Sequence, residues 1–173
     1  MTGTPTLTTA RLTLRRRTPV DAEALFATMA DPAVMRWWSR PPFTSREALR
    51  AHFGEERPQW RAWAVKRTGD AQAIGFVSAG EKRQGKVTEI GYLIAPDLWG
   101  AGIAREAVAA VVAQLFAEGQ RRVFADVDPD NDGSIRLLER LGFTLEGRLR
   151  AEWHTHIGVR DSLIFGLLAG EAR

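Results

Sequence analysis

Two glycines one residue apart, Gly100 and Gly102, lie in the stretch "APDLWGAGIAREAV" at residues 95–108, where an apolar run changes into a helical pattern. A strand, a glycine turn and a helix in this order can aim free backbone N–H groups and the positive end of the helix dipole at an anion. Glycine also removes the Cβ atoms that would hold a phosphate away. The stretch predicts either an anion site or an ordinary left-handed turn, and the rest of the sequence has to decide between them.

Two common nucleotide sites do not fit this loop. A dinucleotide fingerprint needs a third glycine at position 105, where the chain has Arg105. A P-loop needs Gly-Lys-Ser/Thr, and the region has no lysine. The remaining interpretation is another pyrophosphate carrier held at the start of the helix.

Carboxylates on neighbouring segments could act as general bases. Glu89 lies in the strand before the loop and is the first choice, with a solvated strand carboxylate as the alternative role. Asp126 and Asp128 end the next strand, in a "DPDND" stretch that is equally typical of a turn. His154 and His156 could share a strand face, but a metal site needs more ligands, so no metal is expected.

The elements that must position these groups alternate between strands and helices. Thr18 is predicted to cap the first helix, with Pro19 as its first residue, and Thr44 with Glu47 has capping-box spacing. The segment between these helices is expected to be irregular or a short helix, and a hairpin is expected around Gly85. Strands are predicted at 11–17, 60–67, 73–84, 86–94, 121–127, 143–149 and 159–168, and helices at 18–31, 45–53, 103–118 and 133–142. This order predicts a mixed α/β sheet in one domain spanning residues 1–173.

Composition excludes several classes of function. The net charge of +3 is too small for a nucleic-acid footprint, and the leucines in "RLTLRRR" alternate as in a buried strand rather than an RNA-binding patch. The chain has no cysteine, which excludes disulfides, thiolate ligands and a cysteinyl acyl intermediate. It has no apolar leader and no run near the ~18 apolar residues of a membrane span, so a cytoplasmic protein without a membrane partner is expected.

The segments "EIGYLIAPDLWGAGIAREAV" and "DVDPDNDGSIRLLERLGF" resemble the two signature segments of the GNAT acyltransferases. The branch that they resemble most includes the RimJ and RimL ribosomal-protein alanine N-acetyltransferases. The resemblance extends from "LTTARLTLRR" to "RDSLIFGLL", nearly the whole chain. It implies a mostly antiparallel central sheet of six to seven strands with helices on both faces. It also implies acetyl-CoA as cosubstrate, with no metal.

The resemblance assigns the coenzyme to the loop, the strand before it and the second segment. Asp97 departs from the family pattern, which has glutamine or arginine at that position. Leu138 stands where many relatives have a catalytic tyrosine, so Ser134 is the substitute acid, with a helix N-cap as its alternative role; the only tyrosine is Tyr92. The expected coenzyme contacts are Leu93, Ile94, Trp99, Gly100, Ala101, Gly102, Ile103, Ala104, Arg105 and Asn131.

The acceptor side is expected to be lined by Trp37, Trp38, Arg40 and Trp153, with Arg160 close by. The implied activity is direct acetyl transfer to a primary amine, either a protein N-terminus or a small amine, by a monomer or homodimer. A GNAT-like module that binds coenzyme A without turnover is the alternative. A third interpretation is an NAD-type oxidoreductase, but the loop lacks the third glycine of the dinucleotide fingerprint.

Overall fold

The computed structural model describes residues 3–82 and 85–171, and an eight-stranded sheet runs through them in the order β1-β2-β3-β4-β5-β6-β8-β7. Each neighbouring pair is antiparallel except β5 and β6, which are parallel. The strands are β1 (Leu7–Thr8), β2 (Leu12–Arg16), β3 (Trp60–Arg67), β4 (Gly75–Lys82), β5 (Val87–Ile94), β6 (Arg122–Val127), β7 (Thr144–Thr155) and β8 (Gly158–Leu168).

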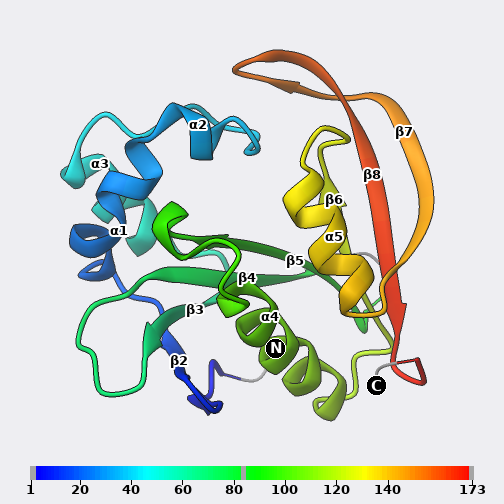
Figure 1. Ribbon diagram of the computed structural model, residues 1–173, viewed down its shortest axis with the longest axis horizontal. Helices are drawn as coiled ribbons and strands as arrows, with labels where there is room; N and C mark the ends of the chain where they lie inside the picture. The colour runs from blue at the N-terminus through cyan, green and yellow to red at the C-terminus, as the bar shows by residue number, and fades with distance from the viewer. Residues whose placement is uncertain (1–2, 83–84, 172–173) are drawn as a thin grey trace.

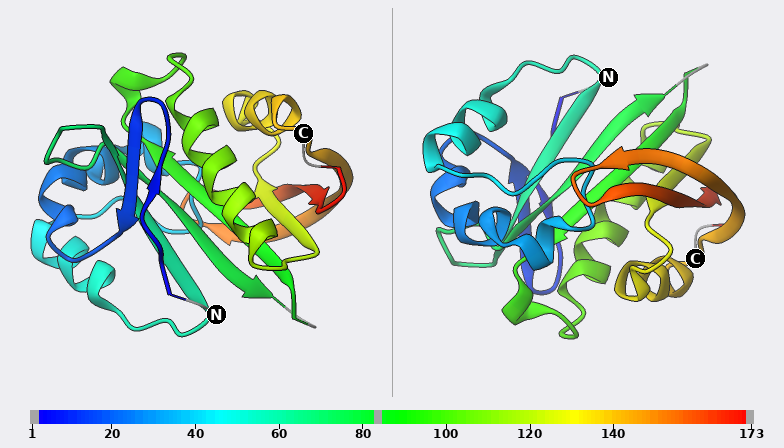
Figure 2. Two further views of the ribbon diagram at one scale, coloured as in Figure 1. Left: turned by 90° about the horizontal axis from the view of Figure 1, so that it is seen from below. Right: turned by 90° about the horizontal axis from the view of Figure 1, so that it is seen from above.

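Helices cover both faces of this sheet (Figures 1 and 2). One face carries α1 (Asp21–Ala30), α2 (Pro32–Met35) and α3 (Arg46–Gly54); the other carries α4 (Ile103–Ala117) and α5 (Asp132–Arg140). A short 3-10 turn, η1 (Pro96–Leu98), precedes α4. No described helix has the length and apolar character that crossing a membrane requires.

Alternating side chains divide the interior into two cores, as the period of a strand requires. On β3, Trp63 and Val65 pack on the face of α4, whereas Ala64 packs on the face of α1–α3. On β5, Ile90 packs on the face of α4 and Leu93 on the face of α1–α3. The predicted alternation of Leu12 and Leu14 is confirmed, since both are fully buried in the α4 core.

The feature that creates the site is the divergence of β5 from β6. Their ladder covers only Val87↔Arg122, Thr88↔Val123 and Glu89↔Phe124. Beyond these pairs β6 turns away from β5 and continues along β8, and Figure 1 shows the two strands separating. Among the strands of residues 3–82 and 85–171, none therefore pairs with this edge of the second half of β5.

The predicted fold class is confirmed, with differences at the edges of elements. The sheet has eight strands rather than six to seven because the two-residue β1 adds an outer strand. Thr18 is not the N-cap of α1: Asp21 instead accepts from the Thr18 backbone N–H at 2.8 Å and binds Arg15 at 2.6 Å. Ser45 rather than Thr44 caps α3, accepting from the Ala48 N–H at 3.1 Å. The short-helix alternative and the hairpin around Gly85 are confirmed as α2 and the β4–β5 pair.

Candidate active site

The turn between β5 and α4 forms a cradle of backbone N–H groups. Gly100 and Gly102 both have φ of +78°, a left-handed conformation that glycine adopts without strain. In the described chain, the N–H groups of Gly100, Gly102, Ile103 and Ala104 donate to no acceptor, and a Cβ on Gly100 would project into open space. The cradle has the free donors and close approach that a phosphate group requires.

Two of the expected loop contacts are used inside the turn. The N–H of Trp99 donates to the Pro96 carbonyl at 3.1 Å, and the N–H of Ala101 donates to the Leu98 carbonyl at 3.4 Å. The indole of Trp99 donates to the Ile94 carbonyl at 2.8 Å, which ties the loop to the end of β5. These contacts shape the loop and leave the donors at the helix start free.

Arg11 lies beside the cradle and was not expected from the sequence. One of its terminal nitrogens would lie 3.4 Å from a Cβ on Gly102, and its other contacts are the Ala101 carbonyl at 3.0 Å and the Glu106 carboxylate at 2.7 Å. Burial raises the pKa of Glu106, but hydrogen bonds from Thr9 and Arg11 outweigh burial, and the net shift is downward. Glu106 therefore stays ionised and holds a guanidinium at the loop. Arg105, the cation expected here, is exposed, as is Asp97.

The open edge of β5 offers backbone groups toward β6. Ala95 donates to the Ile74 carbonyl at 2.9 Å, and hydrogen-bonded pairs alternate along an antiparallel ladder. Leu93, which faces Phe76, therefore directs its backbone groups toward β4, whereas Tyr92 and Ile94 direct theirs toward the open edge. The geometry favours Tyr92 and Ile94 over Leu93 as partners for an extended ligand chain.

The start of α5 faces this open edge. Asn131 caps the helix, and its side-chain oxygen accepts from the Ser134 N–H at 3.1 Å. The hydroxyl of Ser134 is consequently not the cap. Tyr92 lies opposite: its hydroxyl is buried with no hydrogen bond of ordinary geometry to a described residue. Burial raises the pKa of Tyr92 to about 12, against an opposing contribution from the nearby Ser134 hydroxyl.

Leu138, at the position where many relatives have tyrosine, is fully buried in the core and presents nothing to the site. Tyr92 is therefore the phenol that comes close to Ser134. Its alternation with Ile90 and Ile94 along β5 was visible in the sequence and places it on the α4 and α5 face. Its proximity to α5 depends on the strand divergence, which the sequence did not reveal.

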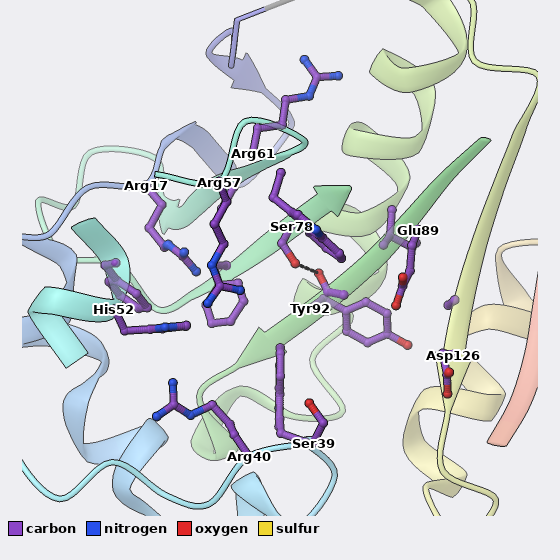
Figure 3. Close-up of a pocket in the computed structure, with 18 of the residues that line it drawn as sticks. Arg17, Ser39, Arg40, His52, Arg57, Arg61, Ser78, Glu89, Tyr92 and Asp126 are labelled. Atoms are coloured by element: carbon purple, nitrogen blue, oxygen red, sulfur yellow. Dashed lines mark hydrogen bonds between the residues drawn. The ribbon is translucent and has the colours of Figure 1, made fainter. Parts of the chain in front are cut away.

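Glu89 and Ser134 line one cavity of about 1020 Å³, together with Asn131 and the expected acceptor residues. Figure 3 shows Glu89 and Asp126 on one side of this cavity, with Tyr92 beside them. The Glu89 carboxylate forms an ion pair with Lys82 at 2.7 Å and keeps 18% of its side chain exposed. It is thus accessible to a substrate, although it shares its charge with a lysine.

The other two carboxylates are held by β7 and β8. Asp126 accepts from the Trp153 indole at 2.9 Å and from the Ser162 hydroxyl. Asp128 is bound by Arg160 through two hydrogen bonds of 2.8 Å, and these hold the pKa of Asp128 below its ordinary value. Both carboxylates therefore fix the walls of the cavity, which leaves Glu89 as the carboxylate best placed to act on a ligand.

The expected acceptor residues come from two separate segments. Trp37, Trp38 and Arg40 follow α2, and Trp153 reaches the cavity from β7. The Trp38 ring packs on Phe76 with centroids 5.6 Å apart. A bulge in the β7–β8 register between Leu149 and Trp153 re-aims the end of β7. The structure brings these four residues to one cavity.

The histidine expectation is wrong in its geometry. β7 ends at Thr155, so His156 lies in the hairpin turn and does not share a strand face with His154. Both are exposed and neither lines the cavity. In residues 3–82 and 85–171, no three His, Asp or Glu side chains gather as metal ligands do.

Several cavity residues were missed by sequence reasoning. They are basic side chains on the wall opposite Glu89, contributed by the residue that follows β2, by α3 and by the segment after α3. No motif marks them, because they meet only when α3 packs beside β2 and β4. These residues are Arg17, His52 and Arg57.

Known proteins share both the sequence pattern and the fold. A family model described as an acetyltransferase (GNAT) domain matches residues 11–144. The uncharacterized N-acetyltransferase YoaA of Bacillus subtilis (strain 168) is 33% identical over 175 residues, with 95% of this chain and 97% of YoaA covered.

Two solved structures show the same fold at lower identity. The RimL ribosomal-protein alpha-N-acetyltransferase in complex with coenzyme A has a TM-score of 0.84 at 20% identity, covering 95% of this chain and 98% of RimL. A spermidine N-acetyltransferase from Vibrio cholerae, in complex with CoA and spermine, has a TM-score of 0.82 at 22% identity, covering 94% and 98%. The chain belongs to the GNAT family of acetyltransferases and is an N-acetyltransferase.

Proposed function

We propose that this chain transfers an acetyl group from acetyl-CoA directly to a primary amine, within a complex that holds both substrates. The observation that carries the proposal is the junction of two sites at the divergence of β5 and β6. A cradle of free N–H groups lies at the end of β5, and a cavity with an accessible carboxylate lies along the same strand. Complexes of structural relatives with coenzyme A support the choice of cosubstrate.

The cradle fits a pyrophosphate. We assign the pyrophosphate contacts to the N–H groups of Gly100, Gly102, Ile103 and Ala104, with the Arg11 guanidinium as an added cation. Ala101 and Trp99 shape the loop, and the exposed Arg105 side chain contributes only long-range charge. The pantetheine arm is assigned to the backbone groups of Tyr92 and the backbone N–H of Ile94, since the Ile94 carbonyl accepts from the Trp99 indole, and to the Asn131 amide, whose nitrogen is not used in capping.

Acetyl-CoA supplies an acetyl thioester, and the protein has to deprotonate the amine and assist the departing sulfur. The amine nitrogen attacks the thioester carbonyl, the C–N bond forms and the C–S bond breaks. Glu89 is assigned as the base that accepts the ammonium proton, directly or through water. An α-amino group has a pKa of about 7.7–8.0, so part of it is already deprotonated near neutral pH and a weak base such as a carboxylate is sufficient.

Ser134 is assigned as the proton donor to the departing thiolate, and its hydroxyl regains a proton, directly or through water, from the second N–H that the attacking nitrogen loses. Its hydroxyl is free of the capping role and lies near the buried Tyr92 phenol, which can orient it. A thiol has a pKa of about 8.5 and leaves fairly well as thiolate, so the donor is expected to contribute modestly. The net reaction converts amine and acetyl-CoA into an amide and free CoA, with no covalent enzyme intermediate, which suits a chain without cysteine.

The test is a thiol-release assay with acetyl-CoA and a panel of amines and N-terminal peptides. The proposal predicts that CoA appears only when a suitable amine is present, in equal amount to the N-acetyl product. Thermal stabilisation by acetyl-CoA without turnover of any amine would instead support a coenzyme-binding module.

A further inference from the structure

The cavity beside Glu89 has two ends of opposite chemical character (Figure 3). The acidic end carries Glu89 and Asp126. Guanidinium groups approach the opposite end from different elements: Arg17 and Arg57 from one side and Arg40 from the other, with the His52 ring beside them. This cationic end is separate from the phosphate cradle, because no residue of 99–105 lines the cavity.

Arg17 is a half-buried cation without an ion pair in the described chain. Its guanidinium is 4.0 Å from the centroid of the Phe53 ring and 4.9 Å from that of Phe76. Burial lowers the pKa of Arg17 to about 10, so the group still carries its charge at pH 7. Two aromatic faces compensate only part of the lost hydration of a guanidinium.

Arg40 is in a similar position on the facing wall. Its guanidinium lies 3.5 Å from the Phe43 ring centroid, and its Nε is buried with no hydrogen-bond partner in the described residues. Burial lowers the pKa of His52, and the Arg40 charge lowers it further, so His52 is neutral at pH 7.

The acidic side chains at this end of the cavity do not pair with all of its guanidinium groups. Arg57 is paired with Glu55 at 2.5 Å, and Glu56 also lines the cavity but is exposed to solvent. Neither glutamate forms an ion pair with Arg17 or Arg40. Two guanidinium groups therefore face the cavity with unused donors, in the planar fork that matches a carboxylate or a phosphate.

We propose that the acetyl acceptor is a small amine that also carries an anionic group, a carboxylate or a phosphate, bound by Arg17 and Arg40 while its amine lies at Glu89. This inference rests on the proposed acetyl transfer and specifies its substrate class. A polyamine fits poorly, because one of its ammonium groups would have to face the guanidinium groups at the far end.

The experiment compares each anionic amine with its neutral counterpart in the thiol-release assay. The anionic amines are glycine, β-alanine, γ-aminobutyrate and O-phosphoethanolamine. Their neutral counterparts are the carboxamides of the three amino acids and, for O-phosphoethanolamine, ethanolamine. Spermidine and a peptide with an N-terminal aspartate complete the panel. We expect at least one anionic amine to exceed its counterpart about tenfold to a hundredfold in kcat/KM, and the carboxylate and phosphate arms identify the anion.

Two variants remove the charges while keeping apolar bulk: Arg17→Met and Arg40→Met. Each is expected to lower kcat/KM for the preferred anionic amine at least about tenfold more than for its neutral counterpart, mainly through KM. Arg50→Met, on the exposed face of α3 outside the cavity, is the matched control and should match the wild type.

Preference for neutral amines, spermidine or the peptide would overturn the inference, as would equal losses on charged and neutral substrates. If no amine is acetylated, the proposed function fails, and the anion site is then judged by binding alone. In that case the N-acetyl acids and their amides are titrated calorimetrically into the protein with CoA. Tighter binding of the acids, weakened at least about tenfold in Arg17→Met, supports the site, and equal binding overturns it.

Discussion

Replacing Gly102 by alanine separates the phosphate role of the cradle from its role in folding. Gly102 and Gly119 stand at the two ends of α4, with φ of +78° and +87°. An L-residue in this conformation is destabilised by about 1–2 kcal/mol. For a chain of this size, each kcal/mol lowers Tm by roughly 2–4 °C. Gly102→Ala and Gly119→Ala should therefore lose similar stability without ligand.

The two variants should differ only when coenzyme is added. At a CoA concentration of about 100 times Kd, binding stabilises the folded wild type by about 2.7 kcal/mol. A tenfold weaker Kd, the minimum expected when a methyl group enters the cradle, reduces this to about 1.4 kcal/mol. The Tm gain of Gly102→Ala should thus be about half that of Gly119→Ala.

The assay is thermal unfolding with and without CoA, followed by calorimetric titration to obtain Kd directly. Equal Tm gains and equal Kd values for the two variants would refute the assignment of the pyrophosphate to this turn. A loss of CoA affinity confined to Gly102→Ala supports the assignment, because both variants carry the same cost of an L-residue at positive φ.

Three further predictions concern the cavity. Glu89→Gln should reduce kcat most below the pKa of the amine, where a base is needed, and a pH–rate profile of unchanged shape would remove Glu89 as the base. Ser134→Ala should lower kcat with little effect on KM for the amine, whereas an unchanged kcat would exclude it as a proton donor. Because Arg160 holds the pKa of Asp128 below that of an unfolded aspartate, this pair stabilises the fold above the unfolded value of about 3.9 and loses that effect as pH falls through the folded pKa. Asp128→Asn should consequently lower Tm at pH 7, with a difference that shrinks toward pH 3; a pH-independent difference would contradict this assignment.

Local sequence signals predicted the parts of the site that depend on the backbone. Gly100 and Gly102 adopt left-handed conformations, and the helix after them begins at Ile103 as expected. These features follow from glycine itself and from an apolar helical period, which act within a few residues.

Side-chain roles were harder to predict because neighbouring polar residues compete to cap the same helix. Ser45 makes the capping contact that Thr44 was expected to make, and α1 begins after Val20 with no side-chain cap, although Thr18 was expected to supply one. Similarly, Asn131 capped α5 and released Ser134.

The cationic end of the cavity lies beyond what the sequence could show. Arg17, Arg40 and His52 are separated by long stretches of chain, and no spacing relates them. Their meeting depends on how α3 packs against β4 and where the segment after α2 passes. The same holds for Tyr92 and Ser134, which meet because β6 leaves β5 after only three paired positions.

The most direct test of acetyl transfer is a mass-balance measurement with acetyl-labelled acetyl-CoA and the amine panel. Direct transfer predicts that labelled N-acetyl product and free CoA form in equal amounts, that both substrates are required, and that the protein itself carries no label. Labelled protein, or coenzyme binding without any N-acetyl product, would contradict the account.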